Sequence, residues 1–204
     1  GGSTELILAD GHDSRALTST KIGAVRLKTE FIKQEPLSDQ RIGFLKTFIQ
    51  GALEPAIDKI SRRLKPGEDP LMVATSGTAM AIGELLRSEK HNSKSKLQGF
   101  KFSKIQLDKL IQDLLRMNPQ GLKKLTSISD RRAEIIVPGI LILQITMEMM
   151  QLDEVVLSER ALREGLVVDW MFRNNLLKDR YSLQSNIRKR TILHQAKRFG
   201  VDFS

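Results

Sequence analysis

Residues 1–27 read GGSTELILADGHDSRALTSTKIGAVRL, and this stretch decides the expected fold. It holds apolar runs at 6–9 and 22–27, and between them residues 15–19 have the length of a return strand. Asp10-Gly11 between 6–9 and 15–19 is a strong turn signal, because glycine adopts positive φ at little cost. The pattern predicts a three-stranded antiparallel meander.

Helical and strand-like segments alternate after the meander. Apolar residues from Ile42 to Ile60 recur every three or four positions, which predicts an amphipathic helix that starts at Ser38 and ends by Pro66-Gly67. Residues 70–75 form a short apolar run typical of a strand covered on both faces. Ser76-Gly77-Thr78 is a turn into a helix over 79–86, with Thr78 as a candidate N-cap.

The remaining segments continue this order. The expected elements are a strand at 99–102, a helix from Ser103, a short helix at 122–125, a long helix from Ser129 disturbed near Pro138, a strand at 155–157 and a helix over 161–172 capped by Ser158.

A meander followed by alternating strands and helices predicts an α/β fold with a mixed sheet and flanking helices. It is the ribonuclease H-like arrangement of the actin-like ATPase superfamily. We expect this domain over 1–172, and over 173–204 a linker and the first helix of a further helical domain.

Composition excludes several classes of protein. The chain has no cysteine, which rules out disulfides, zinc–thiolate sites and a cysteine nucleophile. Its longest apolar run, 135–145, is too short to span a bilayer, and residues 1–5 carry no signal-type core. We expect a cytoplasmic protein without a membrane partner. The net charge of +9 favours anionic partners without choosing among them.

The opening loop has the composition of an anion site. Gly1 and Gly2 let backbone N–H groups approach an anion, and Ser3 and Thr4 add hydroxyl donors. Glu5 could hold a metal ion or a water molecule beside a phosphate. From the chemistry alone, a flexible Gly-Gly-Ser linker explains the same residues equally well.

For each of the other candidate phosphate-binding segments, a purely structural role is an alternative interpretation. Ser76, Gly77 and Thr78 could bind phosphate at a helix N-terminus, or simply join a strand to a helix. Arg131 and Arg132 suit bidentate phosphate contact but equally suit a solvated surface. The basic tail could guide a long polyanion or form a solvated helix face; its candidate residues are Arg188, Lys189 and Arg190.

Five stretches in order resemble the exopolyphosphatase / guanosine pentaphosphate phosphohydrolase (Ppx/GppA) family, in the C-terminal half of its actin-like module. They are Gly1-Gly2-Ser3-Thr4-Glu5-Leu6, Ile22-Gly23-Ala24-Val25-Arg26-Leu27, Ala74-Thr75-Ser76-Gly77-Thr78, Arg131-Arg132-Ala133-Glu134-Ile135-Ile136-Val137-Pro138-Gly139 and Leu157-Ser158-Glu159-Arg160-Ala161-Leu162-Arg163-Glu164-Gly165. The resemblance covers nearly all of the chain and disfavours the linker interpretation.

The resemblance implies an enzyme that hydrolyses a terminal phosphoanhydride of inorganic polyphosphate or guanosine pentaphosphate by Mg²⁺-assisted attack of water. It implies that Gly1, Gly2, Ser3 and Thr4 bind phosphate and that Glu5 supports the metal or the water. It also implies that the tail begins an HD-like helical domain. A homodimer is compatible with the sequence.

Two other functions are alternatives for this sequence. A sugar-kinase-like or chaperone-like ATPase would need a Gly-Gly adenosine loop late in the chain, and Ser76-Gly77-Thr78 is not such a loop. A basic nucleic-acid-binding module would need aromatic platforms or a recognition helix. Aromatic residues are only 5%, and Trp170 and Tyr181 are isolated, so no specific nucleic-acid partner is expected.

The family's loop begins with an aspartate and a further glycine that would precede Gly1, and the resemblance places an upstream half of the module before them. We therefore predict that the purified 204-residue chain releases no phosphate from polyphosphate by itself, because partner carboxylates are lacking. A phosphate-release assay checks this. Hydrolysis by the chain that disappears in Glu5→Gln would contradict the prediction.

Overall fold

A computed structural model describes residues 1–10, 14–33, 36–89, 96–125, 127–174 and 176. The strands are β1 (Ile7–Ala9), β2 (Ser14–Leu17), β3 (Met72–Ala74), β4 (Lys101–Ser103) and β5 (Glu154–Leu157). The helices are α1 (Ala24–Phe31), α2 (Asp39–Ser61), α3 (Gly77–Glu89), α4 (Lys104–Arg116), α5 (Pro119–Lys123), α6 (Asp130–Ala133), α7 (Ile136–Met150) and α8 (Leu162–Arg173).

The chain divides into two compact units. The first comprises Gly1–Ala9 and Ser14–Glu159, and the second comprises Asp10–Asp13 and Arg160–Ser204. The boundary expected near residue 172 stays a prediction.

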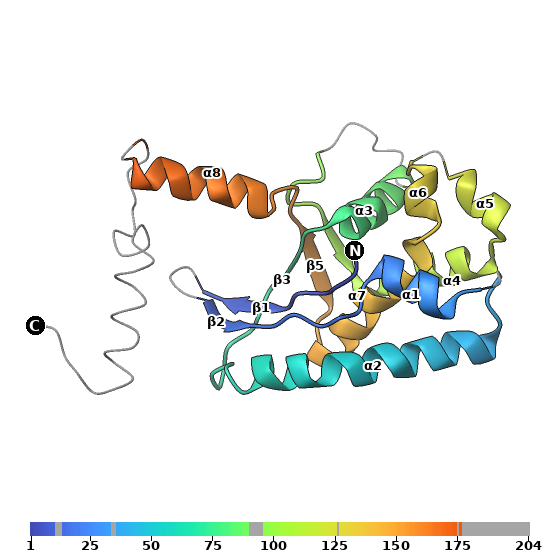
Figure 1. Cartoon of the computed structure of the whole chain (residues 1–204), viewed down its shortest axis with the longest axis horizontal. Coiled ribbons are helices and arrows are strands. Elements are labelled where there is room, and N and C mark those ends of the chain that lie inside the picture. Colours follow the sequence, from blue (N-terminus) through green and yellow to red (C-terminus); the bar gives the residue numbers. More distant parts are fainter. Residues whose placement is uncertain (11–13, 34–35, 90–95, 126, 175, 177–204) are drawn as a thin grey trace, which may run out of the picture. The chain divides into compact units, whose positions relative to one another are not determined.

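The first unit contains two small sheets. β1 and β2 form an antiparallel hairpin in which Ile7 pairs with Leu17 and Leu8 with Ala16. β3, β5 and β4 form a three-stranded sheet in that order, with β3 parallel and β4 antiparallel to β5. The expected α/β fold with a mixed sheet and flanking helices is therefore confirmed (Figure 1).

The expected third strand is wrong. Residues 24–27 belong to α1, and only a single bridge between Thr4 and Thr20 continues the hairpin. Ala24 and Leu27 are buried and Phe31 packs against the core, so the inward residues are spaced three and four apart, as in a helix. A run as short as 22–27 fits this period and the alternation of a strand equally well. The meander thus has two strands and one bridge.

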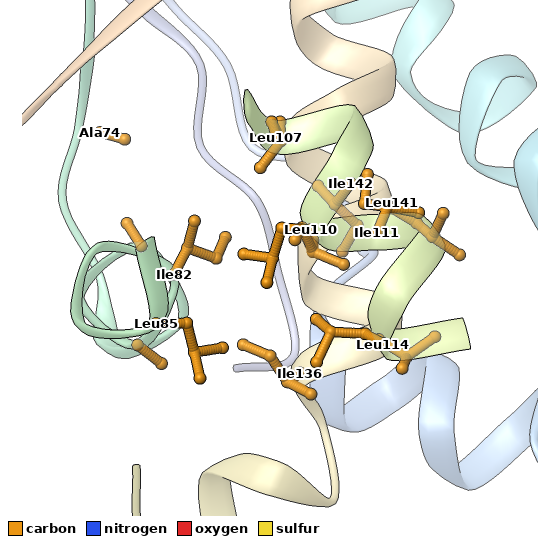
Figure 2. Packing of buried hydrophobic residues seen from close by; sticks show 14 of the residues in the cluster. Ala74, Ile82, Leu85, Leu107, Leu110, Ile111, Leu114, Ile136, Leu141 and Ile142 are labelled. Carbon is orange, nitrogen blue, oxygen red and sulfur yellow. The ribbon is translucent and has the colours of Figure 1, made fainter. Parts of the chain in front are cut away.

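Helix α7 is the centre of the core. It is apolar on nearly every side, as expected of a helix that other elements surround. It packs against α1, α2, α3 and α4. Figure 2 shows the packing of α3, α4 and α7, with labelled side chains Ile82, Leu85, Leu107, Leu110, Ile111, Leu114, Ile136, Leu141 and Ile142.

The long helix expected from Ser129 is broken into α6 and α7, with Glu134 and Ile135 between them. Because α7 begins at Ile136, Pro138 lies in its first turn, where no intrahelical N–H bond is required. The predicted disturbance near Pro138 is confirmed as this break.

Helices start at three of the expected serines, Ser38, Ser103 and Ser129, and the first two cap the helix with their side chains. Ser38 Oγ accepts from Arg41 N at 3.3 Å, and Ser103 Oγ accepts from Gln106 N at 3.3 Å. The predicted cap at Ser158 is wrong, because α8 begins at Leu162. There the carboxylate of Glu164 accepts the backbone N–H of Ala161 at 2.8 Å, which lowers the pKa of Glu164.

The second unit includes α8, whose described residues are all at least partly exposed. Among the described residues of the chain, no helix combines the length and apolarity needed to cross a membrane.

An ion pair ties the hairpin to the loop after α2. Arg15 donates twice to the carboxylate of Glu68, at 2.8 and 2.7 Å, and Lys65 N donates to it at 2.8 Å. These bonds, led by the one from the Arg15 side chain, lower the pKa of Glu68 from 4.5 to about 2.

This shift predicts an acid-dependent stability. In the folded state Glu68 stays ionised below pH 4.5, so its contribution is full above 4.5 and is lost as the pH falls towards about 2. We expect Glu68→Gln to be less stable than the wild type at pH 7 in urea unfolding, with the difference vanishing near pH 2.

The matched control is Glu30→Gln, which removes the carboxylate of an exposed pair with Arg26 on α1. It should change stability little, as exposed i,i+4 pairs contribute ~0.3–0.5 kcal/mol. A constant difference between Glu68→Gln and the wild type from pH 7 to pH 2 would overturn the assignment.

Candidate functional site

The opening loop lies against the segment that leads into α1. Thr4 N donates to Thr20 O and Thr20 N to Thr4 O, both at 2.9 Å. The hydroxyl of Thr4 donates to Ile22 O at 2.7 Å. Thr4 is therefore an anchor of the loop, and its hydroxyl is already engaged with the backbone.

Gly23 lets the loop and the start of α1 come together. A Cβ on Gly23 would lie 2.3 Å from Gly1 O and 2.8 Å from Ser3 N, which no side chain tolerates. In the following turn, Val25 N donates to Gly1 O at 3.2 Å. Gly23 thus fixes where Gly1 and Ser3 lie. Sequence reasoning did not single it out as a site residue, although a glycine just before a buried apolar helix was a usable signal.

Glu5 is exposed and is held by two hydroxyls. Ser3 Oγ donates to Glu5 Oε1 at 2.6 Å, and Ser19 Oγ donates to the same oxygen at 3.0 Å. The two bonds orient the carboxylate of Glu5 through its Oε1 atom. In this arrangement Ser3 serves Glu5 directly, and Ser19 was not among the predicted residues.

The second predicted segment begins α3. Helix α3 starts at Gly77, Ser76 Oγ accepts from Ala79 N at 3.0 Å, and Ser76 O accepts from Met80 N at 3.0 Å. Ser76 is therefore the N-cap, and the prediction that Thr78 caps the helix is wrong. Thr78 is the second residue of α3 and lies against α7, where a Cβ on Gly139 would lie 2.4 Å from its Cγ2.

One cavity brings the two segments together. It has a volume of about 440 Å³ and also has apolar walls from β1, β3 and α7. Figure 1 shows the N-terminus close to α3, in agreement with this lining. The predicted site residues that line it are Gly1, Ser3, Thr4, Glu5, Ser76 and Thr78.

Arg132 lies beside the start of α3. The position that a Cβ of Gly77 would take is 3.9 Å from both Nε and Nη2 of Arg132. The first N–H groups of a helix lack intrahelical acceptors and carry partial positive charge, so a cation there is unfavourable unless an anion joins it. The guanidinium and the helix terminus would each favour an anion at this place.

The other predicted basic residues differ. Arg131 and Arg132 are both exposed and neither lines the cavity, but only Arg132 is placed by a described contact at the start of α3. Arg188, Lys189 and Arg190 lie outside the described residues.

Acidic residues do not gather into a metal cage. Across the described ranges, no group of three His, Asp or Glu side chains is close enough together to hold a metal ion. Mg²⁺, however, usually binds through one or two carboxylates together with phosphate oxygens and water. Glu5, exposed beside a candidate phosphate site, fits the role of one such ligand.

The sequence and fold match known proteins. The model of the Ppx/GppA phosphatase family matches residues 1–174. The chain belongs to this family. A guanosine-5'-triphosphate,3'-diphosphate pyrophosphatase of Vibrio vulnificus is 29% identical over 203 residues, 99% of this chain and 37% of that protein. Exopolyphosphatase 1 of Mycobacterium leprae is 28% identical over 168 residues, 82% of this chain and 48% of that protein.

Solved structures agree with the sequence matches. The Ppx/GppA protein of Aquifex aeolicus is 27% identical, with a TM-score of 0.72 over 86% of this chain and 55% of that one. An exopolyphosphatase of Cytophaga hutchinsonii shares the fold at 19% identity, with a TM-score of 0.75 over 84% of this chain and 55% of that one. The chain thus spans between about a third and about half of these proteins' lengths.

The close approach at Gly23 generates a prediction. We expect Gly23→Ala to destabilise the protein by ~1–3 kcal/mol in urea unfolding, since the added methyl would overlap backbone atoms of Gly1 and Ser3 that no side-chain rotation can clear. Displacing the loop should also weaken tripolyphosphate binding in calorimetry.

Gly43→Ala is the control, because nothing lies within 4 Å of a Cβ at this helical position. It should stabilise α2 by ~0.5–1 kcal/mol and leave binding unchanged. Equal stability and binding for Gly23→Ala and the wild type would show that the loop has room to move.

Proposed function

We propose that this chain supplies the phosphate-binding half of a phosphoanhydride hydrolase that acts on inorganic polyphosphate or guanosine pentaphosphate. The observation that carries the proposal is that residues of the opening loop and of the start of α3 line one cavity, while Arg132 lies beside Gly77 at the start of α3. Relatives of both descriptions, a pyrophosphatase and an exopolyphosphatase, support this substrate class.

In the proposed site, each element has a separate task. The N–H groups at the start of α3 and the Arg132 guanidinium bind phosphate oxygens, and both neutralise charge. The backbone of Gly1, which also lines the cavity, and that of Gly2 bind a neighbouring phosphate in this proposal. The hydrolysis of phosphoanhydrides depends mainly on such positioning and charge stabilisation.

Glu5 is the proposed catalytic residue on this side of the cavity. Its carboxylate, oriented by Ser3 and Ser19, accepts a hydrogen bond from a water molecule and directs it towards the phosphate. Mg²⁺ belongs to the proposal as a cofactor that neutralises phosphate charge, with Glu5 as one oxygen ligand, directly or through water.

The proposed architecture is one ribonuclease H-like half of an actin-like module. The hairpin β1–β2, the strand–helix alternation from β3 to β5 and the similarity to Ppx/GppA structures support it. The remaining part of the active site would then come from sequence that the longer relatives contain outside the matched region.

Binding tests the proposed site on this chain. We expect tripolyphosphate to bind in calorimetry, and Arg132→Ala to lower the affinity ~10- to 100-fold, as expected for charge-assisted hydrogen bonds worth ~1.5–3 kcal/mol. Ser3→Ala and Glu5→Gln should also alter binding, with a larger effect when Mg²⁺ is present, because Glu5 acts with the metal.

Arg26→Ala is the matched control, since it removes the same charge from the exposed face of α1, where Arg26 pairs with Glu30. It should leave the affinity nearly unchanged. Equal losses in Arg132→Ala and Arg26→Ala, together with equal binding of tripolyphosphate and single-stranded DNA at every salt concentration, would indicate non-specific charge and overturn the site.

A further inference from the structure

Three phenylalanines meet at the surface of the first unit, where the end of α1 lies against α2. The ring centroid of Phe31 is 4.5 Å from that of Phe48 and 5.8 Å from that of Phe44. Phe44 and Phe48 are nevertheless 48% and 37% exposed. Phe44 also packs near Phe48, with ring centroids 6.4 Å apart, yet about half of its surface remains exposed.

Cationic groups border these rings. The guanidinium carbon of Arg41 lies 5.9 Å from the centre of the Phe44 ring, within the range of a cation–π contact. Within the part of the chain that the structure describes, no carboxylate pairs with this guanidinium. Lys33 lies at the same end of α1, with its ammonium donating to Thr29 O. Arg41 is thus available to an anion.

A cavity of about 420 Å³ lies beside Phe31 and Arg41, and Phe44 and Phe48 are not among its described lining residues. This volume is within the usual range for small-molecule sites, ~300–1,000 Å³. It combines an aromatic wall, apolar Pro and Leu side chains, a hydroxyl and two cations. Its described lining residues are Phe31, Lys33, Pro36, Leu37, Ser38 and Arg41.

This site is separate from the phosphate cavity, because the two share no described lining residue. They lie at opposite ends of α1: Gly23 precedes its first turn and Phe31 is its last residue. A helix of eight residues is ~12 Å long. The ligand at the phenylalanine end can therefore bind independently of the phosphate site.

We infer that Phe31, Phe44, Phe48 and Arg41 form a site for a nucleobase that carries phosphate, either as a free nucleotide or as part of a single strand. A base stacks on the exposed ring of Phe44, and the phosphate binds Arg41 and Lys33. Stacking suits any base because each has a π face, and the basic chain favours an anionic ligand. The inference does not depend on the proposed hydrolase activity.

The test compares ligands with and without a base. Calorimetry on the 204-residue chain uses GTP, ATP and tripolyphosphate. We expect Phe44→Ala to lower nucleotide affinity ~5- to 150-fold, the range for one stacked base, and to leave tripolyphosphate binding unchanged. Phe44→Tyr keeps an aromatic face and should retain nucleotide binding.

Ile105→Ala is the matched control, because Ile105 is 80% exposed on α4, away from the rings. It should leave all three ligands unaffected. Arg41→Ala should weaken nucleotides more than tripolyphosphate. The inference is wrong if Phe44→Ala changes no affinity, or if it lowers nucleotide and tripolyphosphate affinities equally.

Two further ligands show whether the natural ligand is a free nucleotide or a single-stranded nucleic acid. Oligo(U) binding that depends on Phe44, with no Phe44-dependent binding of GTP or ATP, identifies a single strand as the ligand; the converse identifies a free nucleotide. Poly-glutamate supplies charge without bases. If Phe44→Ala weakens poly-glutamate binding as much as oligo(U) binding, the site recognises an acidic polypeptide and the nucleobase inference is wrong.

Discussion

Gly139 sets the distance between α7 and two other helices, and the rest of the site depends on that contact. A Cβ there would lie 2.4 Å from Thr78 of α3 and 3.3 Å from Ala24 of α1. Each of these helices starts next to one wall of the cavity. Close packing on one buried helix therefore determines the separation of the two candidate phosphate-binding segments. A larger residue at 139 would push α1 and α3 outward and change the cavity, and it would meet the hydroxyl of Thr78, whose Oγ1 lies 3.0 Å from that Cβ.

The hydrogen bonds of the opening loop follow from the same arrangement. Thr4 and Gly23 hold the loop to the entry of α1, so the loop moves with a helix that is itself packed on α7. Ser3 and Ser19 then orient Glu5. A polar group that must direct water or metal needs such support, because an exposed carboxylate on a free loop would sample many rotamers.

Charge has different roles at the two ends of α1. Near α3, Arg132 stands beside a helix N-terminus, where a cation is unfavourable until an anion binds. Near Phe31, Arg41 lies over an exposed aromatic ring, which suits a ligand with both a planar surface and a negative charge. The proposed site near α3 therefore suits a phosphate, and the proposed site near Phe31 suits a base that carries a phosphate.

The sequence by itself determined the α/β class, the strand–turn–helix at Ser76, the starts of α2 and α4, and the family, because short motifs and apolar periodicity are local properties. It could not separate helix from strand at 22–27, where a short run fits both periods until packing against α7 decides. Nor could it bring Gly1 to Ser76, Arg132 to Gly77, or Phe31 to Phe44. Each of these proximities is between residues far apart in the sequence. They are set by tertiary packing, on α7 and between α1 and α2.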